Sequence, residues 1–256
     1  MPAGRLPAGR HQPAIQPLTA RSIMLSTLLG YHPPELPVSA LVQVGGLFGI
    51  AEGTTRAALS RLVAAGDLIA ENGTYRLTER LVRRQDQQDE SASPRSKPWT
   101  GGWEMAVVST PARPQSERVA LRQAMIDLRL AELREGVWIR PDNLVRQIDG
   151  VVASQCTFFR CDYPDPGELT QRLWDLPGWA DAARRLHSSL DNTSSLRAGF
   201  ILIAEVVRHL RLDPFLPAAL LPRGWPGPPL RERYTEFRDH FAQRLRDYSS
   251  RPMSAE

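Results

Sequence analysis

The sequence predicts an α+β protein with an N-terminal winged helix-turn-helix, a central ferredoxin-like α/β domain and a C-terminal helical domain. First, a helix-period stripe ends at Gly66, and two short strands joined by Asn72-Gly73 follow it, which is the order of a winged helix-turn-helix. Second, a strand–helix–strand–strand pattern follows Trp99 and is typical of a small ferredoxin-like sandwich. Third, helical periodicity interrupted by prolines runs from Glu168 to the end of the chain.

Length and composition set the class of protein. The 256 residues are enough for two or three modest domains. With 42% hydrophobic and 23% charged residues, the chain has the composition of a folded globular protein. No apolar run reaches the roughly 18 to 20 residues of a membrane span, and the N-terminus has no apolar signal region, so we expect a cytoplasmic protein. The net charge of +4 mildly favours an acidic partner such as nucleic acid.

The N-terminal part begins with a segment of different character. Residues 1–17 are rich in Pro, Gly and Arg and are expected to form a disordered arm. Thr19 can cap a helix that ends at Gly30, and a second helix is expected over Val38 to Leu47. Together with the next helix and the Asn72-Gly73 hairpin, these elements predict a DNA-binding domain over residues 18–84.

The stretch from Gly49 to Gly66 contains the predicted recognition helix. Its apolar stripe consists of Thr55, Leu59, Leu62 and Val63. The opposite face is small, hydroxylated and basic, and comprises Gly53, Ala57, Ser60, Arg61 and Ala64, flanked by Thr54 and Arg56. Small residues let a helix approach another surface closely, and arginines with hydroxyls suit phosphates and base edges. We therefore expect this face to bind duplex DNA. The alternative is an Ala-rich surface helix without a partner.

The middle of the chain is expected to begin with a linker. Arg80, Arg83 and Arg84 close a helix that leaves the wing, and the polar segment 85–98 contains Pro and Ser. For the central domain, residues 99–166, the expected elements are a strand at Met105–Ser109, a helix at Ser116–Leu130, and strands at Val137–Ile139 and Val151–Phe159.

The third domain is expected over residues 167–250. Its expected helical segments are Leu173–Leu176, Trp179–Leu190, Leu196–Leu210, Pro217–Leu221 and Leu230–Tyr248.

Several runs of the sequence carry a resemblance to a known family. They are Arg56–Gly66, Tyr75–Thr78, Trp99–Trp103, Glu135–Pro141 and Asp213–Gly227. In that order, these runs resemble the PaaX repressors of phenylacetic acid degradation operons. The resemblance implies a dimeric transcriptional regulator, usually a repressor, that an acyl-coenzyme A thioester releases from its operator. The wing tip, Glu71–Thr74, departs from the longer, arginine-rich wing of many relatives, and its carboxylate is repelled by phosphates.

Two sets of candidate site residues follow. The predicted DNA-binding residues are Thr54, Arg56, Ala57, Ser60, Arg61 and Arg76. The candidate effector site combines aromatic walls with arginines for coenzyme A phosphates, and comprises Trp99, Trp103, Arg184, Arg197 and Arg208. The alternative for this second set is that the tryptophans belong to the core and the arginines to a solvated face.

Two other function classes are weighed against DNA binding. The ferredoxin-like domains of this family resemble a small CRISPR-associated metal-dependent nuclease, which needs a carboxylate at the end of its first strand. Here that position reads Val107-Val108-Ser109-Thr110, without an acid. A scaffolding helix-turn-helix would carry apolar residues in place of Arg56, Ser60 and Arg61. We find no Gly-rich phosphate loop, nucleophile elbow or His/Glu metal pair in the sequence, and expect no enzyme, cofactor or metal.

Overall fold

The computed structural model describes residues 19–110, 114–193 and 195–249, and the predicted arm at residues 1–17 lies outside the described residues. The described chain divides into two compact units. The winged-helix unit contains the residues up to Glu90, Leu186–Val207 and the chain from Arg231 onward. The central-sheet unit contains Ser91–Arg185 and Arg208–Leu230. Within the described stretches, no helix combines the length and the apolar character needed to cross a membrane.

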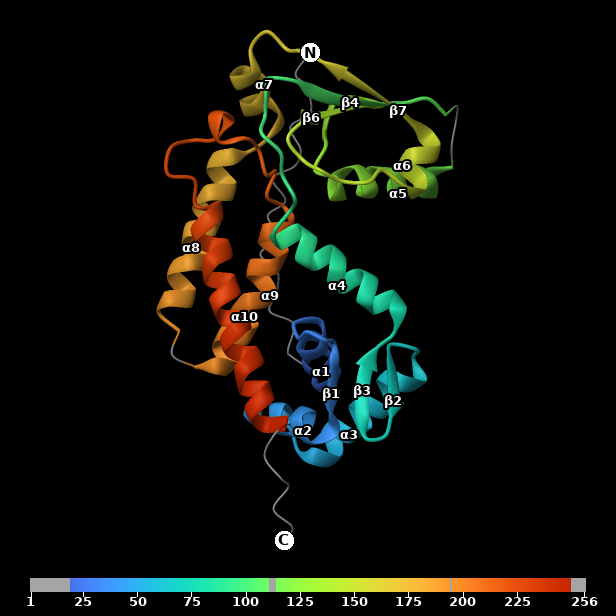
Figure 1. Cartoon of the computed structure of the whole chain (residues 1–256), viewed down its shortest axis with the longest axis vertical. Helices are drawn as coiled ribbons and strands as arrows, with labels where there is room; N and C mark the ends of the chain where they lie inside the picture. The colour runs from blue at the N-terminus through green and yellow to red at the C-terminus, as the bar shows by residue number, and fades with distance from the viewer. Residues whose placement is uncertain (1–18, 111–113, 194, 250–256) are drawn as a thin grey trace. The chain divides into compact units, whose positions relative to one another are not determined.

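The winged-helix unit begins with the predicted helices and hairpin (Figure 1). Its first elements are α1 (Ala20–Leu29), β1 (Glu35–Pro37), α2 (Val38–Leu47), α3 (Glu52–Ala64), β2 (Leu68–Glu71), β3 (Thr74–Leu77) and α4 (Glu79–Ala92). The three strands form an antiparallel sheet in the order β1-β3-β2. Strand β1 was not predicted, because Pro37 was expected to break the chain there. A proline is tolerated on β1 because this strand lies at the edge of the sheet.

Local signals positioned these elements correctly. The Thr19 hydroxyl accepts a hydrogen bond from the Ser22 backbone N–H and caps α1, while Gly30 is the C-cap residue. Asn72 and Gly73 have φ angles of 49° and 76°, as a two-residue type I′ hairpin requires. Gly66, with φ of 70°, follows the end of α3.

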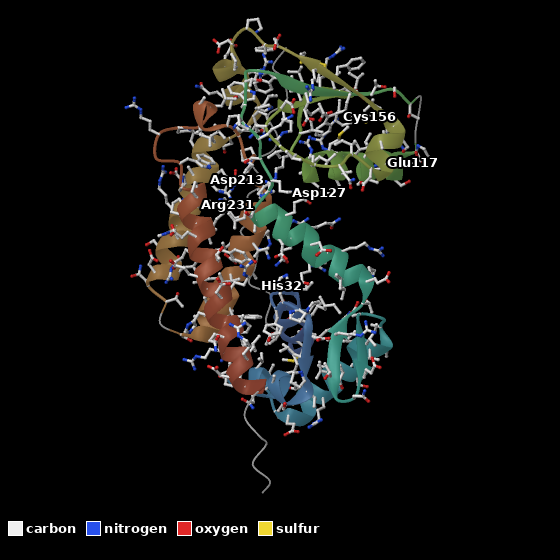
Figure 2. The ribbon with its side chains drawn as sticks, in the orientation of Figure 1. His32, Glu117, Asp127, Cys156, Asp213 and Arg231 are labelled. Carbon is white, nitrogen blue, oxygen red and sulfur yellow. The ribbon has the colours of Figure 1, made fainter. Side chains whose placement is uncertain are left out.

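Helix α4 corrects the expected start of the linker. The polar segment from Gln85 was expected to be linker, but the helix continues to Ala92. Gln85 is buried, and its Nε2 donates hydrogen bonds to the carbonyls of Leu28, Leu29 and Tyr31 at 3.2, 3.0 and 2.9 Å. This amide therefore links α4 to carbonyls at the C-terminal end of α1 and just after it. His32, which is labelled in Figure 2, adds a hydrogen-bond contact of 2.7 Å between its Nε2 atom and the Asp89 carboxylate of the same helix.

The central-sheet unit has the β-α-β-β-α-β order of a ferredoxin-like domain. Its elements are β4 (Trp103–Val108), α5 (Gln115–Asp127), β5 (Ala131–Arg134), β6 (Val137–Pro141), α6 (Gly150–Gln155) and β7 (Cys156–Cys161). The antiparallel sheet has the order β5-β6-β4-β7, and α5 and α6 lie on one of its faces (Figure 1).

Two details of this unit differ from the sequence prediction. Val151–Phe159 was expected to be one strand, but its first part belongs to helix α6 and only the rest to β7. The apolar run fits either structure, and Val152 is buried in the core beneath the sheet. Strand β5 was not predicted, because its sequence, Ala-Glu-Leu-Arg, lacks the β-branched and aromatic residues typical of strands.

The last part of the chain is helical, as predicted. The helices are α7 (Pro166–Leu173), α8 (Leu176–Asp191), α9 (Leu196–Arg211), the short 3-10 helix η1 (Ala218–Leu220) and α10 (Gly227–Ser249). The expected helix at Leu173–Leu176 is wrong, because Trp174 has extended backbone angles and separates α7 from α8. Phe200 of α9 and Phe241 of α10 belong to the same buried core as Met24, Leu41 and Leu59 of the first three helices. The three-part α+β architecture is thus confirmed.

Candidate nucleic-acid interface

Helix α3 has the two faces that its sequence predicts. Thr55, Ala58, Leu59 and Leu62 are buried against the rest of the winged-helix unit. The residues of the opposite face are all exposed, namely Gly53, Thr54, Arg56, Ala57, Ser60, Arg61 and Ala64. The exposure of the predicted face is confirmed, whereas its contact with DNA stays a prediction. We call this set of seven residues the α3 outer face.

Glycines in α2 and in the turn after it allow α2 and α3 to pack closely. A Cβ atom at Gly45 of α2 would lie 2.3 Å from the Thr55 Oγ1 atom of α3, so only glycine fits there without rearrangement. Gly49 has φ of 73°, a conformation that favours glycine, and starts the chain into α3. The Ile50 N–H then donates to the Gly45 carbonyl at 2.9 Å. These contacts fix the direction in which the α3 outer face projects.

The two arginines of the α3 outer face differ in their partners. Arg56 forms an ion pair with Glu52 one turn earlier at 2.7 Å, and the side chains are 47% and 57% exposed. Arg61 instead donates a hydrogen bond from Nε to the Ala57 carbonyl at 3.2 Å, and this bond does not use the two terminal nitrogens of the guanidinium. Sequence reasoning noted Glu52 but missed its pairing, although the spacing of four residues was the available signal.

A buried carboxylate at the end of α3 joins three segments of the winged-helix unit. Asp67 is 5% exposed and accepts hydrogen bonds from Arg21 of α1 at 2.7 Å and from Arg80 of α4 at 2.5 Å. The hydrogen bond from Arg21 is the largest influence on the pKa of Asp67, which is lowered from 3.8, and Arg80 lowers it further against the opposing effect of burial. The ionised carboxylate thereby fixes the chain where α3 passes into β2.

The sixth predicted DNA-binding residue lies on the wing. Arg76 is exposed on β3, the central strand, and is paired in register with Glu35 of β1 and Ile69 of β2. Glu71 at the wing tip is also exposed. The wing therefore presents charges of both signs.

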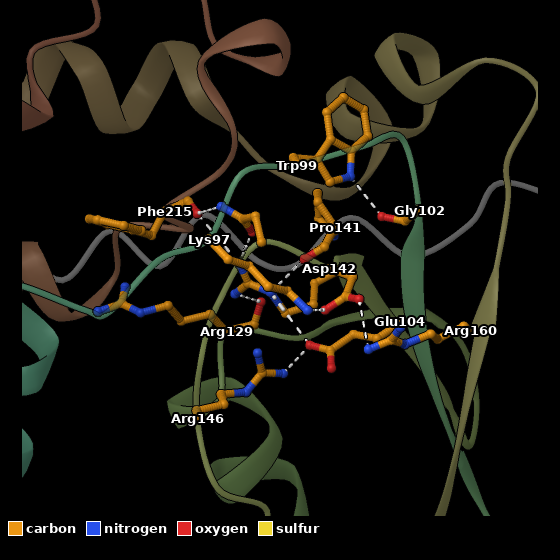
Figure 3. Close-up of polar contacts among 12 residues, drawn as sticks. Lys97, Trp99, Gly102, Glu104, Arg129, Pro141, Asp142, Arg146, Arg160 and Phe215 are labelled. Atoms are coloured by element: carbon orange, nitrogen blue, oxygen red, sulfur yellow. Dashed lines mark hydrogen bonds and ion pairs between the residues drawn. The ribbon is translucent and has the colours of Figure 1, made fainter.

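Two of the predicted effector residues contact each other. Trp99 and Trp103 meet edge to face with ring centroids 6.5 Å apart. Trp99 also donates from Nε1 to the Gly102 carbonyl at 2.6 Å (Figure 3). Trp103 is fully buried in one core beside the central sheet, and Trp138 belongs to the core on the other face.

The three arginines of the effector set are all exposed. Arg184 forms an ion pair with Asp181 at 2.9 Å. Arg197 belongs to the winged-helix unit, whereas Arg184 and Arg208 belong to the central-sheet unit. Among the predicted effector residues, Trp99 and Trp103 contact each other, and the effector role of the set stays a prediction.

Sequence reasoning did not single out Arg140, the most buried charged side chain of the central-sheet unit. Arg140 is 0% exposed and donates to the Asn143 side chain at 2.7 Å and to the Phe215 carbonyl at 3.3 Å. It lies 3.7 Å from the Glu104 carboxylate, which Arg146 also contacts (Figure 3). Burial, together with the charge of Arg146, lowers the pKa of Arg140 well below its usual value. This network attaches the loop at Phe215 to the sheet.

The end of the first strand of the central sheet bears on the nuclease alternative, which requires a carboxylate there. Strand β4 ends at Val108 and is followed by Ser109, so no carboxylate stands at the end of the first strand. In the part of the chain that the structure describes, no group of three or more His, Cys, Asp or Glu side chains is placed to hold a metal ion.

Comparison with known proteins identifies each part of the chain. Residues 19–81 match the model of the PaaX-like protein, residues 96–171 that of the PaaX protein central Cas2-like domain, and residues 174–253 that of the PaaX-like protein C-terminal domain. A solved structure of the uncharacterized protein Rv0674 from Mycobacterium tuberculosis is similar at 43% identity and a TM-score of 0.81. The match covers 90% of this chain and 98% of that one. No protein with a curated description matches.

Proposed function

Because the chain belongs to the PaaX-like proteins, whose membership implies a transcriptional regulator, we propose that it binds duplex operator DNA through α3 and represses a catabolic operon. The observation that carries this proposal is the α3 outer face, which is exposed, small and basic. Gly53, Ala57 and Ser60 leave room for the helix axis to approach the floor of a major groove, while Arg56 and Arg61 supply donors for base edges and phosphates.

The repressor acts as a two-fold dimer. Two copies of α3 on one face of DNA must lie about 34–36 Å apart, or a multiple of this distance, because that is one turn of the double helix. The operator is therefore an inverted repeat whose half-sites have this spacing. Arg76 of the wing supports binding through the phosphate backbone, while the exposed Glu71 keeps the wing tip away from the phosphates.

An effector relieves repression by favouring an arrangement that does not fit the operator. Such a ligand can shift the equilibrium only through different affinities for the two arrangements. Family membership favours an acyl-coenzyme A thioester as the effector. The predicted residues for it remain Trp99, Trp103, Arg184, Arg197 and Arg208.

The test begins with selection of the operator from a random duplex library by the full chain. A Ser60→Glu variant then places a carboxylate in the middle of the α3 outer face, where Ser60 is exposed. We expect its affinity for the selected DNA to fall by at least about tenfold, or 1.4 kcal/mol. The matched control is Gln87→Glu at an exposed position of α4, which changes the net charge equally and leaves affinity within about twofold. Selection of no sequence, or equal effects of the two variants, would contradict the proposal.

A further inference from the structure

The winged-helix unit contains a pocket that neither predicted site uses. It has a volume of about 540 Å³ and opens beside the end of α2 and the helices α8, α9 and α10. Its apolar wall is formed by Leu47 of α2, Leu190 of α8 and Phe237 of α10. Small-molecule sites have volumes of about 300–1,000 Å³ and combine apolar walls with a few polar groups. The size of this pocket therefore suits a small organic ligand.

The polar side of the pocket carries a surplus positive charge. Arg233 and Arg244 line it together with Glu236 and His240. Arg233 is already engaged, since it lies 3.0 Å from the Asp191 carboxylate and 2.9 Å from the Glu236 carboxylate. Arg244, in contrast, has no ion pair with any residue in the described ranges, and its side chain is exposed. A guanidinium in this position is available for a carboxylate on a ligand.

Close packing of α9 against α10 positions the aromatic wall. A Cβ atom at Gly199 would lie 2.4 Å from the Phe237 Cε2 atom, so the glycine leaves the space in which this ring lies. Phe237 is only partly buried and remains available to a ligand on its pocket side. The Phe237 part of the apolar wall is thus held in place by the packing of α9 against α10.

We propose that this pocket binds a small carboxylic acid with an aromatic or aliphatic body. The carboxylate contacts the Arg244 guanidinium, and the body of the ligand lies against Phe237, Leu47 and Leu190. An effect of this ligand on transcription rests on the proposed function of the protein as a DNA-binding regulator. This ligand carries its negative charge on a carboxylate attached directly to the apolar body, whereas in an acyl-coenzyme A thioester that carboxylate is replaced by an uncharged carbonyl and the negative charges lie on the distant phosphates.

A series of aromatic rings connects the pocket wall to the recognition helix. Phe237 stacks on Phe241 with ring centroids 6.2 Å apart, Phe241 contacts Phe200 at 5.4 Å, and Phe200 contacts Phe48 at 5.1 Å. Phe48 is the C-cap residue of α2, directly before the Gly49 turn into α3. Leu47, the neighbour of Phe48, lines the pocket itself. A ligand that displaces these side chains thereby changes the free energy of the α2–α3 arrangement that presents α3 to DNA.

The proposal is tested by ligand binding to the full chain without DNA. Saturation-transfer NMR is recorded with benzoate and hexanoate at millimolar concentration, and with benzyl alcohol and hexanol as uncharged analogues. We expect both carboxylates to bind and to compete with each other, and the alcohols to bind at least about tenfold more weakly. Arg244→Met, which keeps the side-chain bulk, is expected to weaken benzoate binding by at least about tenfold. The matched control, Arg246→Met on the same helix, removes an exposed arginine that does not line the pocket.

Specific outcomes would overturn the proposal. They are binding of neither carboxylate, equal effects of Arg244→Met and Arg246→Met, and Arg244-dependent binding of benzoyl-coenzyme A without binding of benzoate. Unfolding curves of both variants establish that the helices remain folded. A wrong ligand-binding proposal can be distinguished from a wrong proposed function, because DNA affinity is measured in a separate titration. If the protein binds benzoate but no duplex DNA, the result supports the ligand-binding pocket and contradicts the proposed repressor function.

Discussion

Gly45→Ala tests whether α2 and α3 pack as closely as the proposed DNA-binding geometry requires. The added Cβ atom would lie 2.3 Å from Thr55 Oγ1, so the helices or the Thr55 side chain must move. Overpacking of this kind costs about 1–3 kcal/mol, whereas replacement of a helical glycine by alanine returns about 0.5–1 kcal/mol. We therefore expect the winged-helix unit to lose about 1 kcal/mol of stability, within a range of about 0–2.5 kcal/mol.

A double-mutant cycle assigns this loss to one contact. Thr55→Ala removes Oγ1 and Cγ2 and leaves only the Thr55 Cβ atom at 3.4 Å from the added methyl group, which is an ordinary contact distance. In the Thr55→Ala background, Gly45→Ala is expected to cost less than about 0.5 kcal/mol, so the coupling energy is about 1 kcal/mol or more. Gly45→Ala in the otherwise unmodified chain is also expected to weaken operator binding, because the direction of α3 changes.

The assay must report on the winged-helix unit separately. All six tryptophans lie in the central-sheet unit, so their fluorescence serves as an internal control. Hydrogen exchange of peptides from α2 and α3 in increasing urea measures the free energy of unfolding of the winged-helix unit. Additive effects of Gly45→Ala and Thr55→Ala in the cycle would refute the close packing of these two helices.

Three further predictions concern other parts of the chain. Arg56→Ala is expected to relax sequence preference at one base pair by about 1–3 kcal/mol, whereas Arg61→Ala weakens binding to operator and scrambled DNA alike and flattens the salt dependence; isotherms across salt distinguish the two. Asp67→Asn is expected to destabilise the protein at pH 7. Because the folded pKa of Asp67 lies below 3.8, its contribution is present above that range and is lost as the pH falls through the folded pKa, so acid titration should make variant and unmodified chain converge. Gly199→Ala is expected to cost about 1–3 kcal/mol by collision with Phe237, and Phe237→Leu should recover part of the loss in urea unfolding.

Much of the winged-helix unit follows from local sequence signals. The bounds of α2 agree with the predicted Val38–Leu47, and Asn72-Gly73 forms the predicted hairpin. These elements were predictable because a cap, a left-handed turn or a hydrophobic stripe acts within a few residues. The same applies to the α3 outer face, since one period of 3.6 residues determines which side chains face the core.

Several features that the sequence analysis missed involve contacts between distant parts of the chain. The polar sequence around Gln85 suggests a linker. In the structure its amide donates hydrogen bonds to the carbonyls of Leu28, Leu29 and Tyr31, which are far from Gln85 in the sequence. Val151 to Gln155 has the composition of a strand, but burial of Val152 beneath the sheet is achieved by a helix. The pocket at Arg244 was also missed, because it exists only after α8, α9 and α10 pack beside α2.

The most direct test of the central claim places a DNA-cleaving reagent on the recognition helix. Cys156 and Cys161, the two natural cysteines, are replaced by serine, and a copper–phenanthroline group is attached through Ser60→Cys. If α3 lies in the major groove of a two-fold operator complex, the selected DNA is cut at two positions about 10–10.5 base pairs apart, or a multiple of this spacing. The same reagent attached through Gln87→Cys on α4 should give no cuts at these positions. Absence of cleavage from position 60, or a pattern identical to that from position 87, would contradict the assignment of α3 as the DNA-reading element.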